Sequence, residues 1–176
     1  TIVYVTHDQT EAMTLGDYIA LMKDGKVVQF DVPRSLYNYP QEVFGGWFLG
    51  NPGMNFVNAQ VTTDGNGKHI RSPLLMRPMP AQGLSVEENE IVLGIRPEHI
   101  RVSNEPLDED SVPMELQQKW IVVGGQYLLT AAVGDMMIRI KVTPEMGEQV
   151  AQRFYCSLPR DNLIAFNKNG QRIKFS

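Results

Sequence analysis

The sequence has few of the features that mark secreted, membrane-spanning or nucleic-acid-binding proteins. Its 176 residues include one cysteine, Cys156, which excludes a disulfide framework within the chain and suits a reducing cytosol. No apolar run approaches the roughly 20 residues that span a bilayer, so we expect any membrane connection to run through a partner. The net charge of −4 argues against nucleic-acid binding, which usually needs a basic face.

The first residues carry the pattern of a buried strand that stops at a histidine and passes into a helix. Residues 1–5 form a continuous apolar and β-branched run, typical of a strand covered on both faces. After His7, Asp8 can cap a helix, and Glu11 stands where a capping box needs it. We therefore interpret Asp8 and Glu11 as capping residues rather than an acid–base pair. Because a central strand opens the sequence, we expect the chain to be the later part of a longer protein.

Short α and β elements are predicted up to residue 50. Two apolar runs flank Asp24-Gly25, which is typical of a two-residue type I′ hairpin turn. Val32 stands where a helix cap is expected before Pro33, so we expect Asp31 to substitute as the cap. The predicted elements are strands Tyr18–Lys23 and Lys26–Phe30, a helix from Pro33 that ends before Pro40, and a helical pattern over Glu42–Leu49.

The pattern changes at Asn51-Pro52-Gly53, where we place a domain boundary. Beyond it, short β-type segments alternate with turns, which indicates a small barrel or sandwich without a long helix. We expect Trp120 and the alternating Met136, Ile138 and Ile140 to lie in its core. The predicted strands are Asn55–Thr63, Lys68–Arg71, Ile91–Arg96, Met114–Val123, Tyr127–Val133, Met136–Val142, Phe154–Leu158 and Ile164–Phe166.

Four motifs, in this order and spacing, resemble the C-terminal half of ATP-binding cassette (ABC) importer ATPases of the sugar type. That group serves maltose, other oligosaccharides and glycerol phosphate. The motifs cover essentially the whole chain. They are Tyr4 to Met13 (YVTHDQTEAM), Asp24 to Gln29 (DGKVVQ) with Leu36-Tyr37 and Pro40, Gly50 to Phe56 (GNPGMNF), and Leu93 to His99 (LGIRPEH).

The resemblance implies an α+β chain of two parts. Residues 1–50 would be the end of a RecA-like nucleotide-binding domain, and residues 51–176 an all-β, OB-like regulatory (TOBE, MOP-like) domain. In the full-length protein His7 would be the switch histidine that contacts the γ-phosphate of ATP. ATP and Mg²⁺ are the implied cofactors of the full-length protein. The implied solute is a carbohydrate or related polyol.

The same resemblance implies the partners and the location. A second ATPase copy and membrane permease subunits would assemble with the full-length protein. A regulatory protein or ligand would act on the TOBE domain, and no nucleic acid is involved. The protein would be cytoplasmic and peripheral on the inner face of the membrane.

The motifs that hold nucleotide are missing from these 176 residues. A phosphate-cradling loop needs G-x-x-x-x-G-K-[ST], but Gly67-Lys68 is followed by His69. The triplet Gly124-Gly125-Gln126 lacks the Leu-Ser that opens the ABC signature loop. No Walker A, signature or Walker B motif is present, so we predict no cofactor-binding residue here and expect this chain alone to be inactive.

Other interpretations of the same residues are set beside these expectations. His7 could merely end a strand and complete a hydrogen-bond network, and we interpret Arg96-Pro97-Glu98-His99 as fixing a turn and strand pairing. No Cys, Asp or Glu lies at ligand spacing from His69 or His99, so no metal site is predicted. The alternative function is a non-catalytic OB-like module that senses a ligand or binds a partner.

Overall fold

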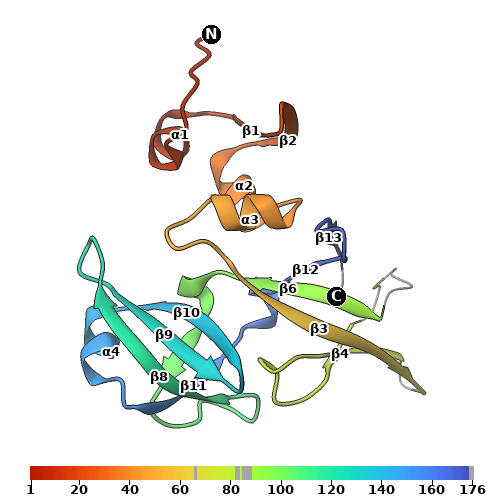
Figure 1. The fold of residues 1–176 in the computed structure, drawn as a ribbon, viewed down its shortest axis with the longest axis vertical. Coiled ribbons are helices and arrows are strands. Elements are labelled where there is room, and N and C mark those ends of the chain that lie inside the picture. The colour runs from red at the N-terminus through yellow and green to blue at the C-terminus, as the bar shows by residue number, and fades with distance from the viewer. Residues whose placement is uncertain (66, 82–83, 85–88, 175–176) are drawn as a thin grey trace.

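Helices and a hairpin come first along the chain, and strands dominate the rest (Figure 1). The computed structural model describes residues 1–65, 67–81, 84 and 89–174. The N-terminal elements stand above the β domain in Figure 1. They are α1 (Gln9–Leu15), β1 (Ile19–Lys23), β2 (Lys26–Asp31), α2 (Pro33–Asn38) and α3 (Val43–Phe48).

The described strands that follow α3 form two antiparallel sheets, with one short helix and two 3-10 turns between them. One sheet has the order β13-β12-β6-β3-β4-β5 and the other β10-β9-β8-β11-β7. Their elements are β3 (Asn55–Asp64), β4 (Gly67–Arg71), β5 (Met79–Pro80), β6 (Glu90–Ile95), the 3-10 turn η1 (Pro97–His99), β7 (Arg101–Ser103), β8 (Val112–Ile121), β9 (Tyr127–Val133), β10 (Met136–Val142), α4 (Pro144–Gln149), β11 (Arg153–Ser157), η2 (Arg160–Asn162), β12 (Ile164–Phe166) and β13 (Arg172–Ile173).

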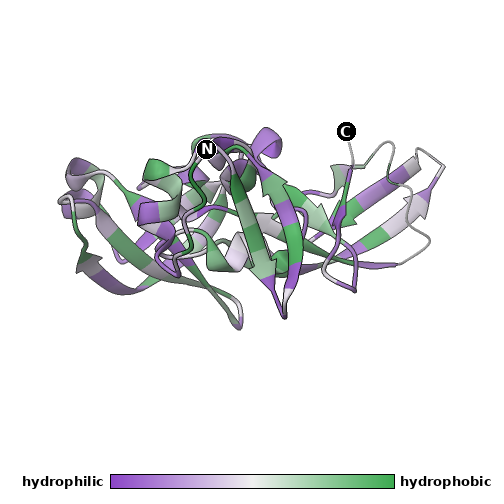
Figure 2. Cartoon of the chain, turned by 90° about the horizontal axis from the view of Figure 1, so that it is seen from above, coloured by the Kyte–Doolittle hydropathy of each residue, from purple (hydrophilic) through white to green (hydrophobic). Residues whose placement is uncertain are grey.

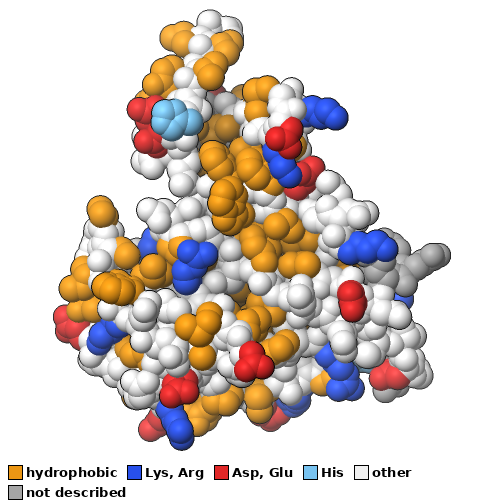
Figure 3. All heavy atoms as spheres, in the orientation of Figure 1, with side chains coloured by type: hydrophobic (Ala, Val, Ile, Leu, Met, Phe, Trp, Pro, Cys, Tyr) orange, Lys and Arg blue, Asp and Glu red, His pale blue; other side chains and the backbone are white. Residues whose placement is uncertain are grey.

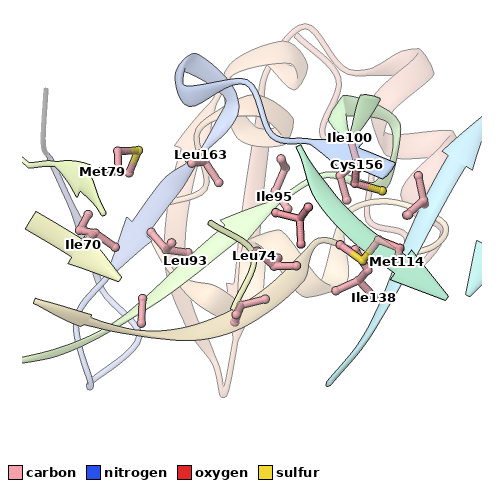
Figure 4. Close-up of a cluster of buried hydrophobic side chains, with 14 of the residues drawn as sticks. Ile70, Leu74, Met79, Leu93, Ile95, Ile100, Met114, Ile138, Cys156 and Leu163 are labelled. Atoms are coloured by element: carbon pink, nitrogen blue, oxygen red, sulfur yellow. The ribbon is translucent and has the colours of Figure 1, made fainter. Parts of the chain in front are cut away.

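The predicted succession of a small α/β part and an all-β, barrel-like domain is confirmed. Strands alternate hydrophilic and hydrophobic bands, as Figure 2 shows, because successive side chains point to opposite faces. The inward faces of both sheets meet in one core, part of which appears in Figure 4. Cys156 lies inside this core, and burial raises the pKa of its thiol to about 12. Within the described residues, no helix is long and apolar enough to cross a membrane.

The hairpin turn follows the sequence prediction. Asp24 and Gly25 have φ angles of 51° and 75°, which is the pair of left-handed residues that a type I′ turn requires. On the buried face of this hairpin, Leu21 packs with Leu36 and Leu49. The hairpin and the short helices therefore share a small core of their own.

Residues 1–5 are not a strand, contrary to the prediction. Ile2, Val3 and Val5 are about 90% exposed, and no ladder partner is present among the described residues. An isolated apolar run cannot form a sheet, because its backbone donors and acceptors need neighbouring strands.

Trp120 is also misplaced by the sequence prediction. Its side chain is 59% exposed, whereas Ile138 and Ile140 are buried as predicted and Met136 is partly buried. The strand β8 pairs with β11 only over Val112–Glu115. Its far end extends beyond β11 beside β9 and β10, and Trp120 is left uncovered there.

Candidate functional site

His7 lies immediately before α1, on the part of the chain that projects from the β domain (Figure 1). Its side chain is exposed. Apolar side chains gather around this projecting lobe in Figure 3. The described residues hold His7 where its imidazole is accessible, not where it completes a buried network.

A compact set of hydrogen bonds shapes the turn that carries His7. Asp8 is the N-cap of α1, and its Oδ1 accepts bonds from the amides of Thr10 at 2.7 Å and Glu11 at 3.2 Å. The hydroxyl of Thr6 accepts the amide of Asp8 at 3.0 Å and donates to Glu11 Oε2 at 2.8 Å. The predicted cap is confirmed, but Glu11 accepts side-chain hydroxyls rather than closing the capping box.

Because Asp8 caps α1, the stability of this helix start should depend measurably on pH. Amide donors from Glu11 and Thr10 lower the pKa of this carboxyl below its ordinary value of 3.8. Because the pKa of Asp8 is lower in the folded state, its ionised carboxylate stabilises the helix fully at pH values above the unfolded-state pKa. This stabilisation is lost as the pH falls through the folded-state pKa. NMR titration of the Asp8 side chain should show the low pKa, and Asp8→Asn should remove the Asp8 transition from the pH dependence of the Thr10 and Glu11 amide shifts. A pKa at or above 3.8 would contradict the capping geometry.

A single bond ties the start of α1 to the connection between the two parts. The amide of Gly50 donates to Gln9 Oε1 at 2.5 Å. Gln9 is two residues from His7, and Gly50 lies two residues after the end of α3. The position of the histidine turn therefore depends on the conformation of the chain where the β domain begins.

Arg96, from the β domain, forms hydrogen bonds to the helices that precede this connection. This arginine directly follows β6 and is 1% exposed. Its Nη1 donates to the carbonyl of Gly46 at 3.0 Å and to the carbonyl of Leu49, and its Nη2 donates to the carbonyl of Tyr37 at 2.7 Å. One guanidinium thus satisfies carbonyls near the ends of both α2 and α3, where helices leave such groups unpaired.

The phenol of Tyr37 completes the cluster. Its ring lies 3.8 Å from the Arg96 guanidinium carbon, and its hydroxyl donates to Glu98 Oε1 at 2.6 Å. Burial and this bond to Glu98 raise the pKa of Tyr37 to about 12. Burial lowers the pKa of Arg96, but a guanidinium stays charged at physiological pH. The buried Arg96, the partly buried Tyr37 and the exposed Glu98 therefore form a joint between the helices and the β domain.

Two glycines allow the joint to close. A Cβ on Gly50, whose φ is 118°, would lie 2.9 Å from Arg96 Nη1. A Cβ on Gly46 would lie 3.0 Å from the Phe56 ring and 3.1 Å from the sulfur of Met54. Gly46, which has a low helix propensity, thus lets α3 approach the β domain.

The remaining sequence candidates do not join His7. His69 Nδ1 lies 3.4 Å from Asp64 Oδ2 on the far sheet, and His99 is partly buried in η1. Among the residues that the structure describes, no group of three His, Cys, Asp or Glu side chains could hold a metal ion. Gly124 and Gly125 have φ angles of 90° and 79° in the exposed β8–β9 turn. The other glycine-rich candidate includes residue 66, which lies outside the described residues.

The sequence correctly indicated a structural role for the motif that contains Arg96, but it did not identify the carbonyls that Arg96 binds. The motif does more than fix a turn, since Arg96 reaches back about fifty residues to Gly46 and Leu49. The signal was available: an arginine at the end of the buried strand Leu93–Ile95 must find acceptors, because a buried unpaired charge is costly. Its partners could not be named from that signal.

Comparisons with known proteins agree with this architecture. A family model described as the MalK OB fold domain matches residues 50–100. The chain is 34% identical over 152 residues to the sulfoquinovosyl glycerol transport ATP-binding protein SmoE of Agrobacterium fabrum, covering 83% of this chain and 40% of that protein. It is 41% identical over 116 residues to the osmoprotective compounds uptake ATP-binding protein GgtA of Synechocystis, covering 66% of this chain and 32% of that protein.

A solved structure resembles the chain more loosely. It is that of the cytoplasmic molybdate-binding protein ModG, with a TM-score of 0.43 and 11% identity, covering 64% of this chain and 95% of that one. This likeness is too slight to support an argument. The curated relatives are closer, and the chain spans well under half of their length. By this similarity and its MalK-type OB fold, the chain belongs to the family of ABC transporter ATP-binding proteins.

Proposed function

We propose that this chain is the C-terminal part of the ATPase subunit of an ABC importer for a carbohydrate or a related polyol. The observation that carries the proposal is the 34% identity to a sulfoquinovosyl glycerol transport protein over 83% of the chain. That alignment is longer than either part of the fold alone. In the proposal, residues 1–50 end the nucleotide-binding domain and residues 51–176 form the TOBE domain.

In the full-length protein, His7 would be the switch histidine. Its support is the motif around it and its exposed position just before Asp8, the N-cap of α1. An imidazole there can donate a hydrogen bond to the terminal phosphate of ATP, where negative charge develops during transfer. ATP and Mg²⁺ would be held by parts of the protein that these 176 residues do not include.

The joint around Arg96 supports a regulatory role for the β domain. It connects the β domain to the carbonyls of the two helices and, through Gly50 and Gln9, to the turn that carries His7. A second ATPase copy and membrane permease subunits would complete the assembly. The protein would then work at the cytoplasmic face of the membrane.

The proposal is tested by comparing two versions of the protein. The full-length subunit with its permease partners should hydrolyse Mg-ATP, and solute uptake by cells should require it. The 176-residue chain should neither bind Mg-ATP at micromolar concentrations nor release phosphate, because it lacks a phosphate-cradling loop. Titration calorimetry and a phosphate-release assay measure both properties. Turnover by the short chain, or uptake that is unchanged without the subunit, would refute the proposal.

A further inference from the structure

The outer face of the six-stranded sheet carries a groove that the proposed transport function does not use. The groove has a volume of about 690 Å³, which lies within the range of small-molecule sites. Its floor is formed by β3, β4 and β6, which lie side by side (Figure 1). Because Val57, Ala59 and Val61 fill the core face of β3, Asn58 and Gln60 point to the opposite, open face.

Three polar side chains cross the floor in one row. Strand pairing places Gln60 opposite Arg71 on β4 and opposite Glu90 on β6. Adjacent strands are about 4.8 Å apart, so the row from Arg71 to Glu90 spans about 10 Å. It presents a guanidinium, an amide and a carboxylate in sequence. Asn58 lies on the same face of β3, two residues before Gln60, and is paired with Val92 on β6.

The side chains of this row have hydrogen-bonding capacity to spare. Asn58, Gln60, Arg71 and Glu90 are exposed, and within the described part of the chain none of them has a hydrogen-bond or ion-pair partner. Together they can donate to and accept from a ligand at several points. Hydroxyl groups both donate and accept, so a polyhydroxylated molecule matches this mixture.

The wall of the groove is apolar and is held in place. The connection from β4 to β5 supplies Pro73, Leu75 and Met76. In the same loop, Arg77 donates to Glu109 at 2.6 Å and to Asp110 at 2.9 Å, and so anchors it to a second loop. An apolar wall beside a polar floor is the usual composition of a small-molecule site.

Arg71 gives the groove a group that can hold an anion. Among the described residues that line the groove, the charged side chains are Arg71, Lys168 and Glu90. A guanidinium recognises phosphate and carboxylate groups through paired N–H donors. We propose that the groove binds a small sugar or polyol bearing one anionic group, of the size of a hexose phosphate. Arg71 takes the anionic group, and Gln60, Asn58 and Glu90 take the hydroxyls.

Titration calorimetry of the 176-residue chain tests this site with three probes: glucose 6-phosphate, glucose and inorganic phosphate. Glucose 6-phosphate should bind saturably, and the other two about tenfold more weakly or worse. Arg71→Gln should weaken glucose 6-phosphate by about tenfold and leave glucose unchanged, since one charge-assisted bond is lost. Gln60→Val, which suits a strand, should weaken both sugars.

A matched control removes an arginine from elsewhere in the β domain. Arg153→Gln lies on β11, on an exposed position outside the groove, and should bind all three probes as the unmodified chain does. Three results would overturn the proposal: no saturable binding of glucose 6-phosphate, inorganic phosphate binding as tightly as the sugar phosphate, or binding that survives both groove variants. None of them bears on ATP hydrolysis by the full-length protein, so the transport proposal is tested separately.

Discussion

Replacing Arg96 with methionine should destabilise the packing of the helices against the β domain by about 3 kcal/mol or more. Methionine fills much of the volume but cannot donate to the carbonyls of Gly46, Leu49 and Tyr37. A hydrogen bond to a charged group contributes about 1.5–3 kcal/mol. The carbonyls of Leu49 and Tyr37 would lose these donors, whereas the carbonyl of Gly46 would keep the amide of Met54. Arg96→Lys should be intermediate, because one ammonium cannot reproduce the planar fork of donors.

The two tryptophans allow this effect to be located. Trp47 lies on α3 and Trp120 on β8, so a Trp120→Phe background reports on the helices and a Trp47→Phe background reports on the β domain. Urea unfolding followed by fluorescence should show Arg96→Met shifting the Trp47 transition to lower urea by more than the Trp120 transition. Arg101→Met, an exposed position on β7, is the control and should shift neither. Equal transitions in Arg96→Met and the unmodified chain would show that the joint contributes no stability.

In the full-length protein, His7→Ala should lower the ATP turnover rate by about 100-fold or more while ATP binding is largely retained. Removing one donor aimed at developing charge typically costs 10²–10³ in rate. Because the imidazole would act on the terminal phosphate, the base and ribose contacts that contribute to affinity should be unaffected. Steady-state phosphate release and nucleotide affinity should be measured on the same preparation.

His69→Ala is the matched control for this experiment. His69 lies on β4, in the other part of the fold from His7. It should leave turnover unchanged. Near-normal hydrolysis in His7→Ala would reduce His7 to a structural residue, and equal losses in both variants would point to misfolding instead.

Local chemistry made much of the fold predictable from the sequence. The Asp8 cap depends on atoms within three residues, and the turn at Asp24-Gly25 depends on two backbone angles. The strands β9 and β10 were placed to the residue because their side chains alternate with a period of two. Each of these features is decided by neighbours in the sequence, so a local pattern is enough to identify it.

The candidate site was predictable only in part. The sequence pattern singled out His7, and the structure places it immediately before the predicted cap, Asp8. The joint that supports this turn was not foreseen, because the bond from Gly50 to Gln9 connects residues 41 positions apart. No periodicity in the sequence encodes which distant carbonyl a donor will reach.

The sequence by itself therefore determined the order of the elements, their turns and the small number of residues with functional chemistry. Only the tertiary structure decided which of them meet. It brought Arg96 to the carbonyls of α2 and α3, aligned Arg71, Gln60 and Glu90 across three strands, and left Trp120 and residues 1–5 uncovered. The physical reason is that burial and strand register depend on segments that are distant in sequence, whereas capping and turn formation depend on adjacent residues.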